Sequence, residues 1–414
     1  MKYIIEPCEK LHGSIKINGS KNSALPIMAA TLLTAEECEI YDVPPLLDVQ
    51  NMKEILLSLN AKVVDGDALK ITCKKPKNAV LDYNLVSKLR ASFLVLGPLL
   101  ARTGRARVAL PGGCQIGTRP VDLHLKGFAS LGAKITQGNG FIEAKARRLK
   151  GAEIYLDFPS VGATENLIMA ATLAEGETVI ENAAIEPEII DLASFLVKLG
   201  AEIYGAGTDT VKIMGKEELS GCKHKVIPDR IEAGTFMTAA AITRGKMVLQ
   251  NVSPEHLKPI TAKMRESGAF ITEFADSIEI DASEKIKPSD IKTLPFPGFP
   301  TDLQAPFTAL LSVSDGTSVV VETIFENRFM HVPELRRMGA NIKVDGRTAI
   351  IEGKKALNGA RVKATDLRAG ASLVLAALVA KDATEVLDCE HIQRGYHDFH
   401  NRLTSMGACV RIDE

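Results

Sequence analysis

A change in the spacing of apolar residues recurs along the chain. Six times a helical amphipathic pattern ends at a small-residue turn, and a strand-like apolar residue follows, as in Leu131-Gly132-Ala133-Lys134-Ile135. A glycine just after a helix supplies the left-handed cap that ends it. The turns carry Ala61, Ala133, Ala201, Ala269, Ala340 and Ala408, which are 72, 68, 68, 71 and 68 residues apart. This even spacing predicts six repeats of a unit of about 70 residues.

A second helical pattern falls in the first half of each unit and is rich in alanine. These segments are apolar nearly all round, which is typical of buried helices, whereas the amphipathic helices before the turns need only one buried face. The predicted buried helices cover residues 22–33, 90–101, 164–174, 232–243, 303–311 and 368–380.

Six units of this length fit two domains of three units better than a solenoid, whose repeats are usually shorter. A chain of 414 residues is also too long for one ordinary core. We therefore predict an α/β protein with two domains, in which buried helices are covered by sheets that form the outer walls.

Composition narrows the function classes. The chain is 46% hydrophobic and 24% charged, and its formal net charge of -1 argues against a nucleic-acid binder or a polybasic membrane anchor. Its seven cysteines include no C-x-x-C pair, so neither a zinc site nor a disulfide framework is indicated. No secretory signal or membrane span is recognisable. We expect a cytoplasmic protein without a metal or nicotinamide cofactor.

One cysteine lies in an unusual loop. Cys114 follows Pro111, Gly112 and Gly113, and Arg119 comes five residues later. A thiol near a guanidinium and a helix N-terminus should be reactive. The other interpretation is a small buried apolar residue, because free cysteines usually are. A Cys-His nucleophile with the nearby His124 would be a third possibility, although no orienting group is apparent.

Charged residues also stand where apolar helices begin. Lys21, Arg90 and Arg368 are cations at predicted helix N-termini, which is unfavourable unless an anion is bound. Together they favour a cationic pocket for phosphate or carboxylate. Asp302, in a Pro-flanked loop, either caps the following helix or serves as a base. Arg394, taken alone, could be a surface residue.

These segments together resemble one family, the UDP-N-acetylglucosamine enolpyruvyl transferases (1-carboxyvinyltransferases) of the EPSP synthase family. The resemblance runs essentially from end to end, in order and with compatible spacing. The segments that carry it are 19–22, 111–114, 119–123, 300–302, 326–329 and 367–369.

The resemblance implies a two-domain inside-out α/β barrel whose chain crosses between domains twice. Residues 1–20 and 229–414 would form the catalytic domain that carries Asp302 and Arg394. Residues 21–228 would form the second domain, which carries the Cys114 loop. This agrees with the six repeats, although the repeats alone do not indicate the first crossing.

The implied reaction joins phosphoenolpyruvate to the 3'-hydroxyl of UDP-N-acetylglucosamine and releases phosphate, the first committed step of peptidoglycan precursor synthesis. By resemblance Cys114 is the acid and can hold phosphoenolpyruvate covalently, and Asp302 is the base. Lys21, Asn22, Arg119 and Arg394 would hold phosphoenolpyruvate. The implied sugar-nucleotide contacts are Arg90, Arg119, Pro120, Val121, Asp122, Leu123, Phe158, Pro159, Ser160, Val161 and Ile324, with Arg328 and Arg368 as further cations.

Two alternatives keep the same fold. A 3-phosphoshikimate enolpyruvyl transferase would share the phosphoenolpyruvate chemistry but lacks the Pro-Gly-Gly-Cys loop. A catalytically inactive paralogue would bind a sugar nucleotide without needing the acid and base together. The expected partners are thus small molecules, with no nucleic acid and no membrane insertion.

Overall fold

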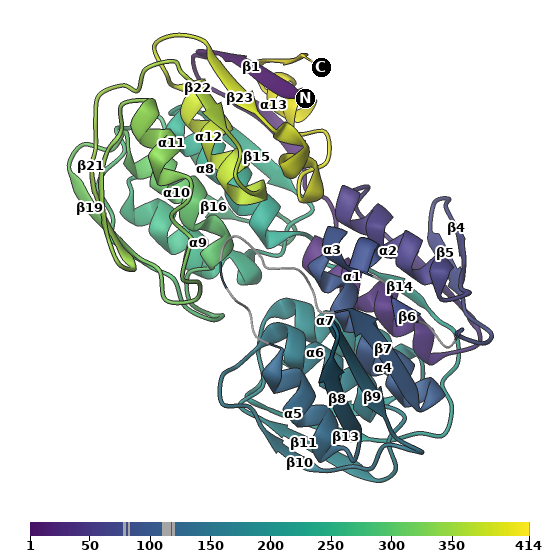
Figure 1. The fold of residues 1–414 in the computed structure, drawn as a ribbon. Coiled ribbons are helices and arrows are strands. Elements are labelled where there is room, and N and C mark those ends of the chain that lie inside the picture. Colours follow the sequence, from purple (N-terminus) through teal and green to yellow (C-terminus); the bar gives the residue numbers. More distant parts are fainter. Residues whose placement is uncertain (78–79, 82, 110–116, 118–120, 414) are drawn as a thin grey trace. The chain divides into compact units, whose positions relative to one another are not determined.

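The computed structural model describes residues 1–77, 80–81, 83–109, 117 and 121–413, and these residues fold into two compact units (Figure 1). Among the described residues, unit 1 comprises 1–18, 117 and 228–413, and unit 2 comprises 19–109 and 121–227 without the gaps just given. Both units mix helices with sheets, so the chain has a mixed α/β fold as predicted.

The described strands of unit 1 form three four-stranded sheets. The first has the order β22 (Arg361–Lys363), β23 (Thr384–Leu387), β1 (Lys2–Glu6), β24 (Cys409–Asp413). The second is β16 (Phe270–Glu273), β17 (Ser277–Asp281), β15 (Lys246–Gln250), β2 (His12–Lys16). The third is β18 (Ile291–Lys292), β19 (Thr317–Val321), β21 (Thr348–Glu352), β20 (Asn341–Asp345).

Unit 2 likewise has three four-stranded sheets within its described residues. The first has the order β14 (Lys223–Lys225), β3 (Glu37–Tyr41), β5 (Leu69–Thr72), β4 (Lys62–Val64). The second is β6 (Val80–Leu81), β7 (Arg105–Ala109), β9 (Phe141–Lys145), β8 (Lys134–Gly138). The third is β10 (Glu153–Tyr155), β11 (Glu177–Glu181), β13 (Thr210–Met214), β12 (Glu202–Tyr204). In every sheet of the two units, one edge strand pairs in parallel with its neighbour and the other two pairings are antiparallel.

The alanine-rich segments form buried helices. In unit 2 they are α1 (Lys21–Ala30) with the 3-10 turn η1 (Thr31–Leu33), the 3-10 segment η2 (Arg90–Val95) with α4 (Leu96–Thr103), and α6 (Val161–Ala171). In unit 1 they are α8 (Arg230–Ile242), η3 (Thr301–Leu303) with α10 (Gln304–Leu311), and α12 (Leu367–Leu378). All residues of α8 and of α10 are buried. Figure 1 shows α8, α10 and α12 side by side within unit 1.

The amphipathic segments form the second set of helices, each with one buried face. They are α2 (Leu47–Ser58), α5 (Asp122–Ser130) and α7 (Pro187–Lys198) in unit 2, and α9 (Pro254–Glu266), α11 (Val332–Arg337) and α13 (Phe399–Thr404) in unit 1. The predicted left-handed turns follow them, at Asn60, Gly132, Gly200, Gly268, Gly339 and Gly407, with φ between 71° and 105°. Two short helical segments, α3 (Tyr83–Lys88) and η4 (Cys389–Arg394), complete the described elements.

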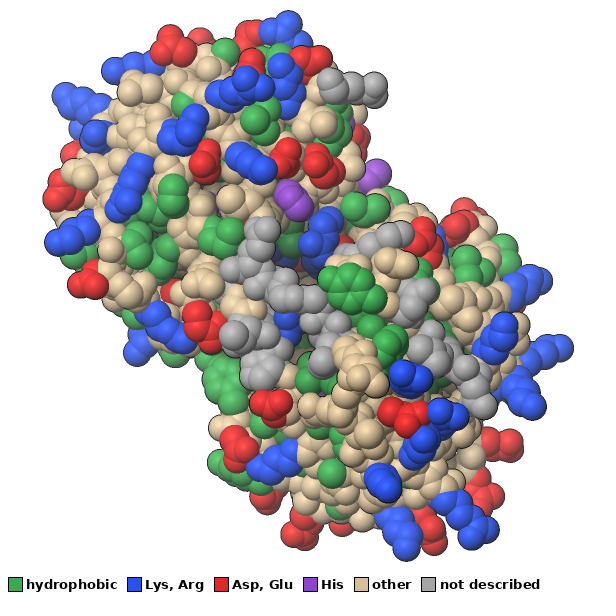
Figure 2. All heavy atoms as spheres, in the orientation of Figure 1, with side chains coloured by type: hydrophobic (Ala, Val, Ile, Leu, Met, Phe, Trp, Pro, Cys, Tyr) green, Lys and Arg blue, Asp and Glu red, His purple; other side chains and the backbone are tan. Residues whose placement is uncertain are grey.

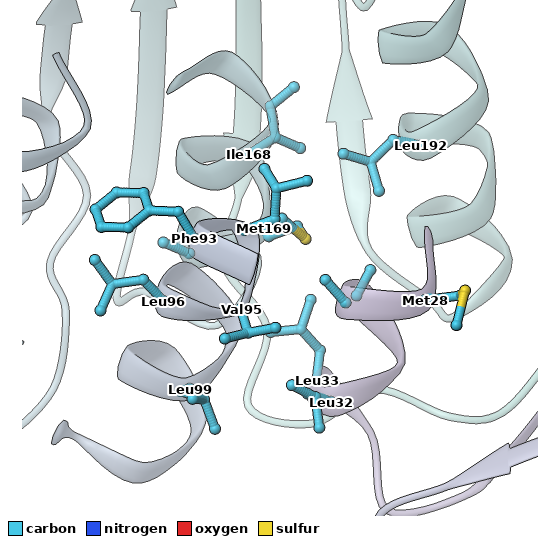
Figure 3. Packing of buried hydrophobic residues seen from close by; sticks show 14 of the residues in the cluster. Met28, Leu32, Leu33, Phe93, Val95, Leu96, Leu99, Ile168, Met169 and Leu192 are labelled. Atoms are coloured by element: carbon cyan, nitrogen blue, oxygen red, sulfur yellow. The ribbon is translucent and has the colours of Figure 1, made fainter. Parts of the chain in front are cut away.

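Each unit has its own hydrophobic core. In unit 2 the buried helices meet there: Met28 and Leu32 come from α1 and η1, Leu96 from α4 and Ile168 from α6 (Figure 3). These side chains are excluded from water, and such burial contributes about 1.5–3 kcal/mol for each large apolar side chain. Helices that pack on one another in this way need apolar residues on several faces, which explains their composition.

The surface carries charges of both signs. On the face drawn in Figure 2, blue Lys and Arg and red Asp and Glu side chains are interspersed over both units, in agreement with the net charge of -1. Among the described helices none is both long and apolar enough to cross a membrane.

Candidate functional site

Asp302 in unit 1 lies between two buried arginines. Its Oδ1 accepts a hydrogen bond of 2.8 Å from Nη2 of Arg328, and its Oδ2 accepts one of 3.0 Å from Nη2 of Arg368. The two arginine side chains are 4% and 3% exposed, whereas the Asp302 side chain is 25% exposed. The carboxylate therefore faces two guanidinium groups on its inner side and remains accessible on another.

Local structure explains why Asp302 is available for this pairing. It is the middle residue of η3, and neither η3 nor α10 has a side-chain cap at its N-terminus. The interpretation of Asp302 as a helix cap is therefore wrong, because its oxygens bond to guanidinium groups from other elements. Arg328 also donates from Nε to the carbonyl oxygen of Thr301 at 3.4 Å, which ties it to the same turn.

Aromatic and acidic groups surround Arg368. Its guanidinium carbon lies 5.2 Å from the centre of the Tyr396 ring, and Tyr396 in turn shares a hydrogen bond of 2.8 Å with Thr235 on α8. Burial opposes the charged form of Arg368, but Tyr396, Asp302 and Asp229 outweigh it and raise its pKa above the usual value. Arg368 is thus a permanent buried cation.

Two more of the predicted site residues, Arg394 and Ile324, also belong to unit 1. Arg394 is the last residue of η4. The next residue, Gly395, lies close to α12: a Cβ added to it would be 2.5 Å from the Leu367 side chain and 3.6 Å from Nη1 of Arg368. Ile324 is partly exposed and follows β19 by three residues. The structure thus brings Asp302, Arg328 and Arg368 together, and Arg394 precedes a glycine that lies near Arg368.

In unit 2 the predicted cation Lys21 has an acidic partner. Its Nζ lies 3.2 Å from Oδ2 of Asp48, and both residues are buried, at 8% and 2% exposure. Asp48 lies in the first turn of α2, which sequence reasoning did not single out. The signal available was an acidic residue at the N-terminus of an amphipathic helix, a common helix feature. Asn22, the next residue of α1, is partly exposed.

Arg90 begins the 3-10 segment η2, which runs directly into α4, so it stands at a helix start as predicted. It acts electrostatically on His124 of α5: burial, and then the charge of Arg90, lower the pKa of His124 to about 3. The neutral His124 ring is held by Asn166, whose Nδ2 lies 3.1 Å from its Nδ1. An imidazole with so low a pKa is a weak base, which argues against the Cys-His nucleophile interpretation.

The remaining predicted residues of unit 2 lie at two helix starts. Val121 and Leu123 are partly exposed and Asp122 is exposed, at the beginning of α5. The segment 158–161 leads into α6, where the Ser160 hydroxyl caps the helix by accepting from the amide of Ala163 at 3.4 Å. In the first turns of α6, burial and then the charges of Glu188 and Glu186 raise the pKa of Glu165 well above its usual value.

Cys114, Arg119 and Pro120 lie outside the described residues. Within the part of the chain that the structure describes, no group of three or more His, Cys, Asp or Glu side chains could hold a metal ion.

A family model described as EPSP synthase (3-phosphoshikimate 1-carboxyvinyltransferase) matches residues 5–403. The UDP-N-acetylglucosamine 1-carboxyvinyltransferase 2 of Carboxydothermus hydrogenoformans is 57% identical over 413 residues, which are 99% of this chain and 98% of that protein. The UDP-N-acetylglucosamine 1-carboxyvinyltransferase 1 of Caldanaerobacter subterraneus subsp. tengcongensis is 55% identical over 410 residues, 99% of either chain.

Solved structures agree with this fold. The crystal structure of the enolpyruvyl transferase NikO from Streptomyces tendae superposes with a TM-score of 0.90 at 25% identity, covering 99% of this chain and 98% of that one. EPSP synthase from Acinetobacter baumannii gives a TM-score of 0.79 at 18% identity over the whole of both chains, which is a similarity of fold alone.

Proposed function

This chain belongs to the EPSP synthase (3-phosphoshikimate 1-carboxyvinyltransferase) family, and we propose that within it the chain is a UDP-N-acetylglucosamine 1-carboxyvinyltransferase. It transfers the enolpyruvyl group of phosphoenolpyruvate to the 3'-hydroxyl of UDP-N-acetylglucosamine and releases phosphate. Relatives that are 54–57% identical over nearly the whole chain carry the name of this activity. The product is the first committed precursor of peptidoglycan.

One observation in the structure supports this chemistry most directly. The carboxylate of Asp302 is bonded by Arg328 and Arg368, yet a quarter of its side chain is exposed. Nearby cations favour the charged form of a carboxylate, and the two hydrogen bonds fix the plane of this one. An ionised, oriented carboxylate with an open side is what a general base for a sugar hydroxyl requires.

The proposed reaction has two steps. In the addition, the thiol of Cys114 protonates the methylene carbon of phosphoenolpyruvate while Asp302 accepts the proton of the 3'-hydroxyl, and a new C–O bond forms to give a tetrahedral ketal. In the elimination, the Cys114 thiolate takes a proton back from the methyl group of the ketal, the carbon–carbon double bond returns, the C–O bond to phosphate breaks, and the departing phosphate takes the proton held by Asp302. Each step needs a proton donor or acceptor at a fixed place.

Cations hold the two anionic groups of phosphoenolpyruvate. We assign this role to Lys21, Arg119 and Arg394, with Asn22 beside Lys21. Lys21 is already paired with Asp48, so the ammonium group is held in place before the ligand arrives. The proposed contacts of the sugar nucleotide are Arg90, Arg119, Pro120, Val121, Asp122, Leu123, Phe158, Pro159, Ser160, Val161 and Ile324.

We further propose that the two compact units are two domains of an inside-out barrel, built from six repeats. Residues 1–20 and 229–414 would form the catalytic domain with Asp302 and Arg394, and residues 21–228 the domain with the Cys114 loop. The common pairing pattern of the six sheets supports this proposal. A cytoplasmic location belongs to the same proposal, because the scattered cysteines fit a reducing compartment.

Phosphate release after mixing phosphoenolpyruvate with UDP-N-acetylglucosamine tests the activity. We expect release by the wild type, none by Cys114→Ser, and release by Cys114→Asp that resists inactivation by an epoxide analogue of phosphoenolpyruvate. No release by the wild type would refute the proposal. In a parallel reaction, shikimate 3-phosphate replaces the sugar nucleotide, and phosphate release only there would favour the alternative activity.

A further inference from the structure

A buried carboxylate organises the segment from which Asp302 projects. Glu322 directly follows β19 and is 1% exposed. Its Oε1 accepts hydrogen bonds from the Thr293 hydroxyl at 2.9 Å, the Ile324 amide at 2.8 Å and the Phe325 amide at 3.1 Å. Its Oε2 accepts one from the Thr301 hydroxyl at 2.9 Å. One side chain thereby joins three separate segments of unit 1.

The identity of the side chain matters for this arrangement. A buried charge is costly unless hydrogen bonds satisfy it, and here four neutral donors do so. A carboxylate offers only acceptor sites, as four converging donors require. A glutamine would present an amide to one of them, and an apolar residue would leave two backbone amides and two hydroxyls without an acceptor. The arrangement therefore requires an acidic residue here.

Both sides of the Asp302–Arg328 pair depend on these bonds. On one side, Thr301 is the residue before Asp302, and its hydroxyl is bonded to Glu322. On the other side, the Phe325 amide is bonded to Glu322, and the Phe325 ring lies 5.7 Å from the guanidinium carbon of Arg328. Arg328 then bonds to Asp302 and to the Thr301 carbonyl.

We propose that Glu322 is a positioning residue, acting through the Thr301 hydroxyl, that fixes the Asp302 carboxylate for proton transfer. This inference rests on the proposed function, in which Asp302 accepts the proton of the sugar hydroxyl. A general base must lie within hydrogen-bond reach of that proton, and a misplacement of about 1 Å lowers the rate by roughly 100-fold. Substrate binding uses many other contacts and depends less on this one.

Thr301→Val removes the hydroxyl and keeps the shape of the side chain. Thr301 is partly exposed, so the variant is expected to fold. We expect kcat for phosphate release to fall by roughly 10- to 100-fold, while KM for both substrates changes by less than about threefold. Thr301→Ser restores the hydroxyl and should recover kcat to within about threefold of the wild type. Glu322→Gln, which keeps some of the bonds, should give an intermediate kcat.

A matched control removes a similar bond elsewhere in unit 1. The hydroxyl of the buried Ser289 donates to Oε1 of Glu266 at 2.8 Å. Ser289→Ala should lower the melting temperature less than Thr301→Val does, because the Glu266 side chain is 48% exposed, and should leave kcat unchanged. With the assay run well below the melting temperature of Thr301→Val, a loss of kcat confined to that variant cannot come from a smaller folded fraction.

Three outcomes would overturn the inference. The first is a Thr301→Val enzyme whose kcat stays within threefold of the wild type. The second is a rise in KM for the sugar nucleotide with kcat unchanged, which would indicate a binding role. The third is a Thr301→Ser enzyme as slow as Thr301→Val. Failure of the proposed function would be visible in the wild type alone, because no phosphate would appear, and it would remove this inference as well.

Discussion

Replacing Asp302 by alanine should destabilise unit 1, although a quarter of the Asp302 side chain is exposed. The substitution leaves Arg328 and Arg368 without their shared carboxylate, and their side chains are only 4% and 3% exposed. Two buried guanidinium groups would then lie near each other without the carboxylate that neutralises their charge. Asp302→Asn keeps an acceptor for one arginine and should cost less.

The magnitude follows from the two hydrogen bonds. Removing one partner of a buried ion pair typically costs about 3–5 kcal/mol, and exposure of Asp302 lets water replace part of the lost interaction. We therefore expect about 2–3 kcal/mol for Asp302→Ala. For a unit of 150–250 residues, each kcal/mol shifts the melting temperature by about 2–4 °C. The expected decrease is about 4–12 °C.

Scanning calorimetry in a chloride buffer without phosphate measures this decrease, since phosphate could replace the missing carboxylate. Asp281→Ala is a suitable control, because Asp281 pairs with Lys246 at 2.7 Å with side chains 37% and 67% exposed. Surface pairs contribute about 0–1 kcal/mol. If Asp302→Ala melts within about 1 °C of this control, the argument that the buried arginines depend on Asp302 is wrong. Added phosphate should stabilise Asp302→Ala more than the wild type.

Three further predictions concern stability. Lys21→Met leaves the carboxylate of Asp48 buried without its ammonium partner and should lower the free energy of unfolding by about 3–5 kcal/mol. The double variant Lys21→Met with Asp48→Leu should regain most of this stability but should not release phosphate. Equal melting temperatures of the single and the double variant would contradict this prediction. Burial lowers the pKa of His331 to about 4, below the unfolded value of about 6.5, so its contribution to stability is complete above pH 6.5 and is lost as the pH falls toward 4. Between pH 8 and pH 5 the free energy of unfolding of His331→Gln should therefore decrease by about 2 kcal/mol less than that of the wild type. Melting temperatures of the two proteins that fall in parallel over this pH range would contradict the prediction. Gly19→Ala places a Cβ against the backbone carbonyl oxygen of Asp42 and should lower the free energy of unfolding by about 1–3 kcal/mol. The control is Gly138→Ala on β8, where the new Cβ meets no atom within 4 Å, and this variant should melt like the wild type.

Local patterns predicted the local structure well. The apolar segment 22–33 became α1 and η1, and the segment 303–311 became the end of η3 and α10. The glycines of the turns, such as Gly132 at φ 88° and Gly200 at φ 101°, adopt the left-handed conformation that ends the preceding helix. In these cases the cause lies within a few residues, because a buried helix needs apolar faces and a left-handed cap favours glycine.

Partners distant in the chain could not be predicted. Asp302 looked like a helix cap because its neighbours in sequence fit that role, but its oxygens bond to Arg328 and Arg368, which are 26 and 66 residues away. The sequence signals of Asp48 and Glu322 were not specific, because acidic residues at a helix start or a strand end are common. Their roles depend on which donors the tertiary fold brings to them.

The buried helices also explain why the unusual residues gather at helix starts. A helix that is packed on several sides has no room for charges along its length, so charged residues are tolerated mainly in its first turn. There Arg368 is the second residue of α12, Lys21 begins α1, and Asp229 caps α8 by accepting from the amides of Ile231 and Glu232. In α1, α8 and α12 the composition that builds the core thus leaves these charged side chains at the N-terminal end. A cation that opposes the helix dipole at such a position is stable only if an anion lies nearby, and the bonds of Arg368 to Asp302 and Lys21 to Asp48 supply one in each unit.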